Sequence, residues 1–502
     1  MPSKQPRIAA LTVSVWAFFV LGGFLAAWHG SSLPQGRAQE PRPGPTKLYF
    51  GVSACVDCHG KGTRLEDPLC RCTEVSIWEE KDKHKDAYKV LSEPLAQRMG
   101  ELLKIDVLKD KSCVSCHGVV IQDESQRHRS FKESDGVSCV VCHGPYREWV
   151  GPHGLETERD MWRQLTRKEK EERYGMTDLW DPFKRAQLCL SCHVGNAAEG
   201  KVITHDMYAA GHPPLPSFEL ATFSEEMPRH WQLLGEKSQK VKALLQATAD
   251  DTRFERTQLL LVSGALAHGS TLRLLEAEAV EARWPEFARL DCYACHHDLQ
   301  SPGWRQDRKV QGKPGRAPLA SWPMPLHKLG ERLTLTREPD PGLTALRTEL
   351  DRVPFGKASN LREPARKSAE RSEALARTLA ARKLTTADVL ALLHELCRIA
   401  IEDGPDYDSA RQIAWSFAIV HGELLADAQR GGQVPEAVLR NQDQVQRVLE
   451  ELKTGLRLKL PSGKESITGQ LDANLKTLYR YDPARFRAAF AQLKAALPPA
   501  GR

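Results

Sequence analysis

The sequence predicts a mainly α-helical protein with two unlike regions: residues 39–335, with little regular structure, and a C-terminal α-helical bundle in residues 343–502. Two observations carry this prediction. Twelve of the thirteen cysteines lie between Cys55 and Cys295, among short helical patterns, many turns and few strand-like alternations. From about Leu343 onward the composition is Ala, Leu, Arg, Glu and Lys, with apolar residues at helical spacing.

The length and composition are those of a globular protein. The chain has 502 residues, of which 41% are apolar and 27% charged, and this length suggests about two or three domains. Its 71 basic and 65 acidic residues give a net charge of +6. This excess is too mild and too dispersed to indicate nucleic-acid binding, so no nucleic-acid partner is expected.

The N-terminus predicts export. Lys4 and Arg7 precede an uncharged stretch at residues 8–28, and residues 36–38 (GRA) offer the small side chains that a signal peptidase needs. The apolar stretch of about 21 residues is long for a signal peptide and close to the roughly 20 that span a bilayer. Residues 1–38 are therefore either a cleaved signal peptide or an N-terminal membrane anchor. Both place the rest of the chain in the periplasm or otherwise outside the cytoplasm.

Five copies of one cysteine–histidine pattern dominate the middle of the chain. Chance would supply about 0.01 such motifs at this composition. The copies are CVDCH at residues 55–59, CVSCH at 113–117, CVVCH at 139–143, CLSCH at 189–193 and CYACH at 292–296.

The spacing of the pattern predicts covalently attached haem. Two thiols three positions apart can each form a thioether with one haem vinyl group, and the histidine that follows is held beneath the iron as an axial ligand. Zinc ribbons pair two CxxC units and need no such histidine. We therefore expect five c-type haems. The attaching cysteines are Cys55, Cys58, Cys113, Cys116, Cys139, Cys142, Cys189, Cys192, Cys292 and Cys295, and the axial histidines of the motifs are His59, His117, His143, His193 and His296.

Three cysteines lie outside these motifs. Cys70 and Cys72 are separated by one residue and could pair only with strain, so they are either unmodified or weakly bridged thiols, or they form a local disulfide or have a redox role. Cys397 lies in the helical pattern ALLHELCRIA and is expected to be a buried core thiol.

Separate helices are expected between the motifs. The sequence predicts them at residues 78–91, 157–174 and 252–283, the last capped by Asp251 and ending before Pro285.

Two irregular segments are expected before the bundle. Residues 302–325 are rich in Pro, Gly, Lys and Arg, and would lay Trp304 and Trp322 over the last haem. Residues 337–342 are expected to form a linker to the bundle.

Three stretches resemble the cytochrome c-554 family of multihaem cytochromes. They are the CHGP of residues 142–145 followed by His153, the pattern W-x5-H-x2-A-Y of residues 78–88, and the HDMYAAGHP of residues 205–213. The resemblance covers about residues 50–300. It implies mostly bis-histidine haems in close stacked pairs that move electrons outside the cytoplasm. This chain departs from the family's tetrahaem pattern by the fifth motif at Cys292 and by the helical tail.

The resemblance favours several further histidines as distal ligands. Matching positions are His84, His153, His205 and His212, and His230 in MPRHW is a weaker fifth candidate.

The remaining histidines in this region are less favoured as ligands. His268 lies on an apolar helix face and is either a core residue or a ligand. His297 and His327 are weaker candidates for iron ligands. Met207 is an alternative axial ligand that nothing singles out.

His205 and His212 are seven residues apart in THDMYAAGHPPL. On a helix this spacing is a rise of roughly 10 Å, so the two imidazoles cannot share one iron. Gly211 is expected to end the helix, and His212 precedes Pro213, which favours extended backbone. We therefore expect each histidine to serve a different haem.

Three functions are compatible with these features. The favoured one is a multihaem c-type cytochrome that carries electrons between extracytoplasmic redox proteins, with membrane attachment through the N-terminal segment left open. The alternative is a redox enzyme acting on a small nitrogen compound, such as nitrite or hydroxylamine, at a haem with an open axial position. The lysine-ending CxxCK variant of nitrite reductases is absent from the sequence. The third is a haem scaffold whose C-terminal bundle docks to a membrane or a partner complex.

Overall fold

The computed structural model describes most of the chain after residue 45. The described residues are 46–60, 71–248, 250–297, 299, 301, 303, 312–335, 338–458, 476–478 and 480–499. They belong to one compact unit, Gly44–Arg502. The predictions for the export segment, for Cys70 and for Trp304 lie outside the described residues.

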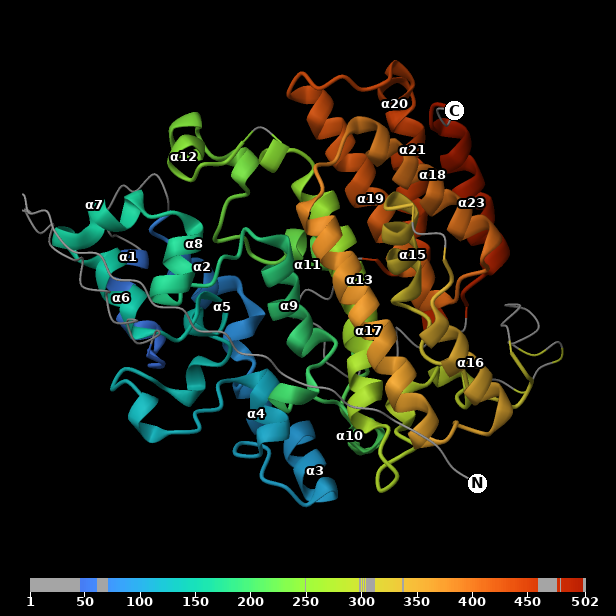
Figure 1. Cartoon of the computed structure of the whole chain (residues 1–502), viewed down its shortest axis with the longest axis horizontal. Helices are drawn as coiled ribbons and strands as arrows, with labels where there is room; N and C mark the ends of the chain where they lie inside the picture. The colour runs from blue at the N-terminus through green and yellow to red at the C-terminus, as the bar shows by residue number, and fades with distance from the viewer. Residues whose placement is uncertain are drawn as a thin grey trace, which may run out of the picture. The chain divides into compact units, whose positions relative to one another are not determined.

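The described part of the chain is helical, as predicted (Figure 1). Its only β-type pairing consists of isolated bridges, such as the one between Lys47 and Tyr146. No helix among the described residues has both the length and the apolar character needed to cross a bilayer.

The helices before residue 250 are short. They are α1 (Val56–His59), α2 (Glu74–Lys81), α3 (Pro94–Leu103), α4 (Lys111–His117), α5 (Cys139–His143), α6 (Arg147–Gly154), α7 (Glu156–Gln164), α8 (Arg167–Tyr174), α9 (Pro182–His193), α10 (His205–Ala210), α11 (Leu220–Glu226) and α12 (Gln239–Leu244).

The later helices are mostly longer and pack against one another (Figure 1). They are α13 (Glu255–Glu278), α15 (Met324–Leu333), α16 (Pro341–Arg352), α17 (Ala358–Ala381), α18 (Thr386–Glu402), α19 (Tyr407–Gln429), α20 (Glu436–Arg440), α21 (Gln442–Gly455) and α23 (Pro483–Ala496).

Helix α13 lies at the centre of this unit and packs along α17 (Figure 1). The main apolar core around this helix is formed by residues of several helices. It includes Leu190 of α9, Leu260 of α13, Leu393 of α18, Phe417 of α19 and Phe490 of α23. These side chains are at most 1% exposed, and each contributes about 1.5–3 kcal/mol of burial free energy. Helices before and after the predicted linker therefore share one apolar core.

The helix predicted at residues 78–91 is wrong as a single element. Helix α2 already ends at Lys81, because Asp82 takes an extended conformation and its carboxylate accepts the backbone N–H of His84. Two short 3₁₀ helices follow, Lys83–Asp86 and Lys89–Ser92. An aspartate that caps the next turn competes with continuation of the helix before it.

The helix predicted at residues 157–174 is two helices, α7 and α8. The break falls at Thr166, whose hydroxyl accepts the N–H of Glu169 at 3.1 Å, while the Glu169 carboxylate accepts the N–H of Thr166 at 2.9 Å. This reciprocal capping box starts a new helix.

The bounds predicted for the long helix at residues 252–283 are also wrong. Helix α13 starts at Glu255 and ends at Glu278. Asp251 does not cap it, because its carboxylate accepts the N–H and hydroxyl of Thr248 at 2.8 and 2.7 Å.

The two segments predicted to be irregular are partly helical. Helix α15 begins at Met324, and Trp322 packs against the main core. Helix α16 begins at Pro341 with Asp340 as its N-cap, so the predicted linker ends inside a helix.

Candidate cofactor site

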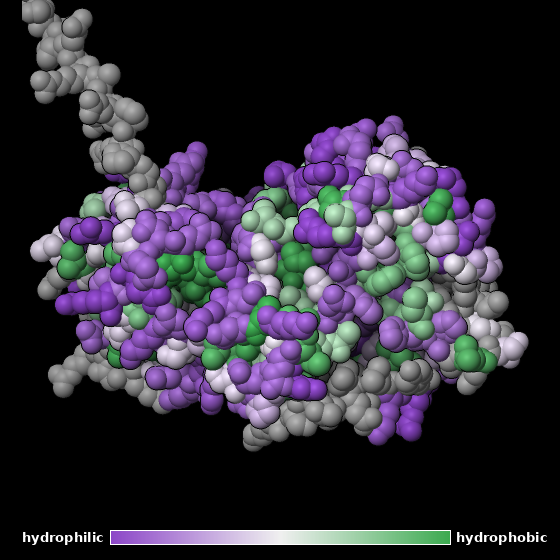
Figure 2. All heavy atoms as spheres, turned by 90° about the horizontal axis from the view of Figure 1, so that it is seen from below, coloured by the Kyte–Doolittle hydropathy of each residue, from purple (hydrophilic) through white to green (hydrophobic). Residues whose placement is uncertain are grey.

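Four of the five CxxCH motifs line one cavity of about 1530 Å³. A pocket for one drug-sized ligand is about 300–1,000 Å³, so this cavity is large enough for more than one. Its wall includes Tyr407 and Arg411 of α19, so the C-terminal helices help to enclose it. The outer surface is different: Figure 2 shows a face on which polar side chains surround smaller apolar patches.

Each of these four motifs forms the C-terminal turn of a short helix. The two cysteines are three positions apart, so they lie on the same helix face. Helices α1, α4, α5 and α9 end at His59, His117, His143 and His193 respectively.

Cysteines of different motifs meet across the cavity. A hydrogen bond with Cys139 and burial together raise the pKa of Cys55, and a hydrogen bond with Cys192 and burial raise the pKa of Cys116. The first motif therefore lies beside the third, and the second beside the fourth.

Three histidine pairs face each other across the cavity. Two imidazoles bound on opposite sides of one metal, with bonds of about 2 Å, have ring centres roughly 6.3 Å apart. The observed ring-centre distances are 6.2 Å for His59 with His153, 6.2 Å for His84 with His193, and 6.4 Å for His117 with His212.

The Nδ1 atoms of five of these six histidines are held by hydrogen bonds. Backbone carbonyls only accept, so a histidine that bonds one through Nδ1 carries its proton there and leaves Nε2 as the metal-binding atom. The partners are Ala87 O for His117 (2.8 Å), Pro213 O for His212 (2.8 Å) and Trp149 O for His153 (2.9 Å), while Glu74 holds His59 and Asp82 holds His84, both at 2.9 Å.

Burial keeps two motif histidines neutral. It lowers the pKa of His143 and of His193 to about 4. A histidine must be neutral to bind a metal. Burial also acts against the charged form of His84, but the hydrogen bond and charge of Asp82 outweigh it and raise the His84 pKa.

His230 lies on the same cavity as His143. After burial, His230 has the largest influence on the pKa of His143 and lowers it further. The structure therefore brings these two predicted ligands near each other.

The fifth motif lies apart from the other four. Cys292, Cys295 and His296 are exposed and do not line the cavity. His205 lies near the segment before this motif: its N–H donates to Glu286 at 2.8 Å, and its ring packs edge-on against Phe287 at 5.5 Å.

The stretch that carries His205 and His212 folds as expected. Helix α10 starts at His205, and Gly211 ends it with a φ of +117°. This left-handed conformation suits glycine. The two histidines have different surroundings: His212 faces His117, whereas His205 lies against Phe287.

His268 is buried in the helical core, one of its two predicted surroundings. Its ring centre is 4.2 Å from that of His327, too close for a metal between the rings, and its Nδ1 bonds the Ser372 hydroxyl at 2.9 Å. Cys397 is fully buried, as predicted, and burial raises its pKa to about 12.

The sequence interpretation missed the acids that orient the histidines. Glu74 and Asp82 each hold the Nδ1 of a predicted ligand. Asp82 had a local signal, because it stands two residues before His84. Glu74 is fifteen residues from His59 and had none.

Paired histidines beside CxxCH turns define the class of a c-type cytochrome. Residues 54–144, which hold the first three motifs, match the family model described as cytochrome c554 and c-prime. The match supports a c-type cytochrome with covalently bound haem that takes part in electron transfer, a class that is typically extracytoplasmic. No curated protein and no solved structure matches the chain.

Proposed function

We propose that the protein is a multihaem c-type cytochrome that carries electrons between extracytoplasmic redox proteins through five covalent haems. Haem supplies reversible one-electron chemistry, and the chain sets ligands, spacing and burial. The observation that carries the proposal is the set of three histidine pairs spaced at 6.2–6.4 Å.

We assign to each haem two cysteines for covalent attachment and two histidines as iron ligands. The cysteines of each motif would form the thioethers. The histidines that would bind the irons are His59 with His153, His117 with His212, His193 with His84, His143 with His230, and His296 with His205. The contacts of Cys55 with Cys139 and of Cys116 with Cys192 support close pairing of the first haem with the third and of the second with the fourth.

Two histidines available for each iron favour a carrier over an enzyme, because substrate binding at iron would need an open position. The alternative, reduction or oxidation of a small nitrogen compound, fits best at the fifth motif. There His296 is exposed and lies outside the cavity.

Spin-state spectroscopy of the purified, oxidised protein tests the proposal. We expect low-spin signals from the bis-histidine haems and no binding of nitrite or hydroxylamine. A high-spin haem in the native protein that binds either compound would favour the enzyme.

One substitution tests the pairing directly. His212→Ala is expected to convert one haem to high spin, and only one. The matched control is His128→Ala, because His128 bonds Ser130 at 2.7 Å and does not line the cavity. Unchanged spectra for His212→Ala would contradict the assignment.

A further inference from the structure

His230 stands on a segment without regular structure. Residues 227–233 join α11 to the short 3₁₀ helix Leu234–Glu236. His153 and His193, by contrast, lie within helices that fix their backbone. A metal ligand must be held in one orientation by its surroundings. The groups that hold this segment therefore decide where His230 points.

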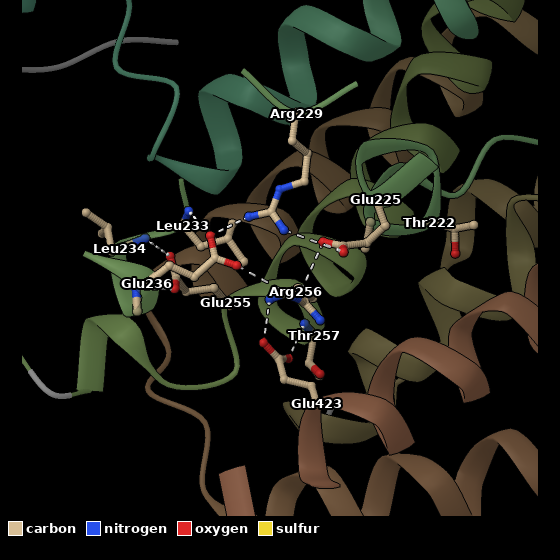
Figure 3. Close-up of polar contacts among 12 residues, drawn as sticks. Thr222, Glu225, Arg229, Leu233, Leu234, Glu236, Glu255, Arg256, Thr257 and Glu423 are labelled. Atoms are coloured by element: carbon tan, nitrogen blue, oxygen red, sulfur yellow. Dashed lines mark hydrogen bonds and ion pairs between the residues drawn. The ribbon is translucent and has the colours of Figure 1, made fainter. Parts of the chain in front are cut away.

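The residue before it, Arg229, is fixed at both its side chain and its main chain, and Figure 3 shows the side-chain contacts. Its guanidinium forms ion pairs with Glu225 at 3.8 Å and with Glu236. Its carbonyl accepts a hydrogen bond from Arg71 Nη1 at 3.0 Å. A fork held by two carboxylates cannot rotate without losing one of them.

Arg256 ties the same two carboxylates to α13 (Figure 3). Its Nε lies 3.0 Å from Glu225, and its Nη2 lies 4.0 Å from Glu236. We call Glu225, Arg229, Glu236 and Arg256 the Arg229 cluster. It alternates two acids and two bases, so each charge has a partner of opposite sign.

Glu423 of α19 anchors the cluster in the C-terminal helices (Figure 3). Its carboxylate accepts the backbone N–H groups of Arg256 at 2.9 Å and Thr257 at 2.8 Å. Phe254, at the N-cap of α13, has a φ of +57° and gives no side-chain cap. Glu423 thus supplies from another helix the acceptor that a first turn requires.

A second contact reaches another axial histidine. Arg71, which donates to the Arg229 carbonyl, has its own N–H accepted by Glu74, and Glu74 holds Nδ1 of His59 at 2.9 Å. The path from α19 to the cavity therefore ends at two histidines, His230 and His59.

We propose that the Arg229 cluster is a positioning device that holds His230 against its iron and couples this ligand to the C-terminal helices. The inference rests on the proposed function, in which His230 and His143 bind one haem. The C-terminal helices would then influence the position of His230 as well as stabilise the fold. A shift of α19 would move the first turn of α13 and, with it, the Arg229 cluster.

The test is carbon monoxide binding to the reduced holo-protein, followed by absorbance, with spin state measured in the oxidised form. His230→Ala is expected to open one haem to carbon monoxide. Arg229→Ala should open the same haem partially and raise the apparent affinity for carbon monoxide about 10- to 100-fold, because loss of a group that orients a metal ligand typically weakens metal binding by that factor. Arg229→Lys should fall between, because an ammonium cannot bridge both carboxylates. Glu423→Gln should act in the same direction but less.

The matched control is Arg273→Ala. Arg273 lies on α13, the helix that also carries Arg256 of the cluster. It forms ion pairs with Glu373 and Glu276, both at 2.8 Å, away from His230. It should leave carbon monoxide binding unchanged. Far-UV circular dichroism checks that each variant is folded, and Arg229→Lys serves if Arg229→Ala is not.

Failure of the two ideas is distinguishable. If His230→Ala leaves spin state and carbon monoxide binding unchanged, His230 is not a ligand and that axial assignment falls. If His230→Ala opens a haem while the folded Arg229 variants do not, the positioning role is overturned and the proposed function stands.

Discussion

The parts of the molecule before and after α13 use their side chains in opposite ways. Helix α1 has four residues and buries none of them, while α5 has five and buries Val140. Helix α19 has 23 residues, and its buried positions run from Tyr407 to Asp427. The motif helices direct cysteines and histidines at the cavity, whereas the later helices pack against one another.

This difference in packing indicates that the part before α13 depends on its cofactors for stability, whereas the later helices do not. In the first part, the cysteines and histidines of the first four motifs line a cavity instead of packing against one another. The apolar core of that part is therefore complete only when haems are attached in the cavity. Helix α9 lies on the border: Ala186 and Leu190 belong to the main core, while Cys192 and His193 line the cavity.

The largest effect should come from producing the chain without haem attachment. We expect residues 71–245 to become sensitive to limited proteolysis, while the helices from α15 onward stay protected, because only the first part needs the haems for its core. Mass spectrometry of the fragments measures this, and the holo-protein is the control. Equal cleavage of both parts would break the comparison.

The reverse experiment disturbs the self-packed part. Phe490 of α23 is fully buried and lies 5.8 Å from the ring of Phe417. Phe490→Ala should lower the free energy of unfolding by about 3–5 kcal/mol, the usual cost of truncating a buried aromatic ring. Denaturant titration followed by far-UV circular dichroism measures the loss.

The haem spectrum of the same variant is its internal control. It should keep the native low-spin signals at denaturant concentrations where the variant is folded. A spin-state change there would show that the cavity responds to the packing of α23, and the two parts would then be less separate than their packing indicates.

Much of the candidate site was predictable because its signals are local. The CxxCH spacing identified the motif turns, and the resemblance identified His84, His153 and His212, which the structure places 6.2–6.4 Å from motif histidines. Which histidine faces which was not predictable, because residues far apart in the sequence meet across the cavity.

The errors in the helix bounds have two different causes. The break at Thr166 was readable, since Thr166 and Glu169 have the spacing of a capping box. The start of α13 was not, because its cap is Glu423, which lies 167 residues beyond Arg256. A cap supplied by tertiary contact leaves no signature near the helix that it starts.

The smallest effect concerns Asp251, which links the two parts through an ion pair with Lys383. Burial raises the pKa of Asp251, but hydrogen bonds from Lys383 and Thr248 outweigh it and lower the pKa to about 2. Because the folded pKa lies below the usual value of about 3.9, the ionised carboxylate stabilises the fold above pH 4. This contribution is lost as the pH falls from about 4 through about 2.

Asp251→Asn should remove that part of the pH dependence and cost less than about 1 kcal/mol at pH 7, since Lys383 is half exposed and solvent screens the pair. Free energies of unfolding at pH 3 and pH 7 for Asp251→Asn, Lys383→Met and the double variant isolate the pair. A double variant that loses the full sum of the single losses would show no coupling. The association of the two parts would then depend on the apolar contact of α13 with α17. The ion pair of Asp251 with Lys383 would be a surface contact that adds no stability to that association.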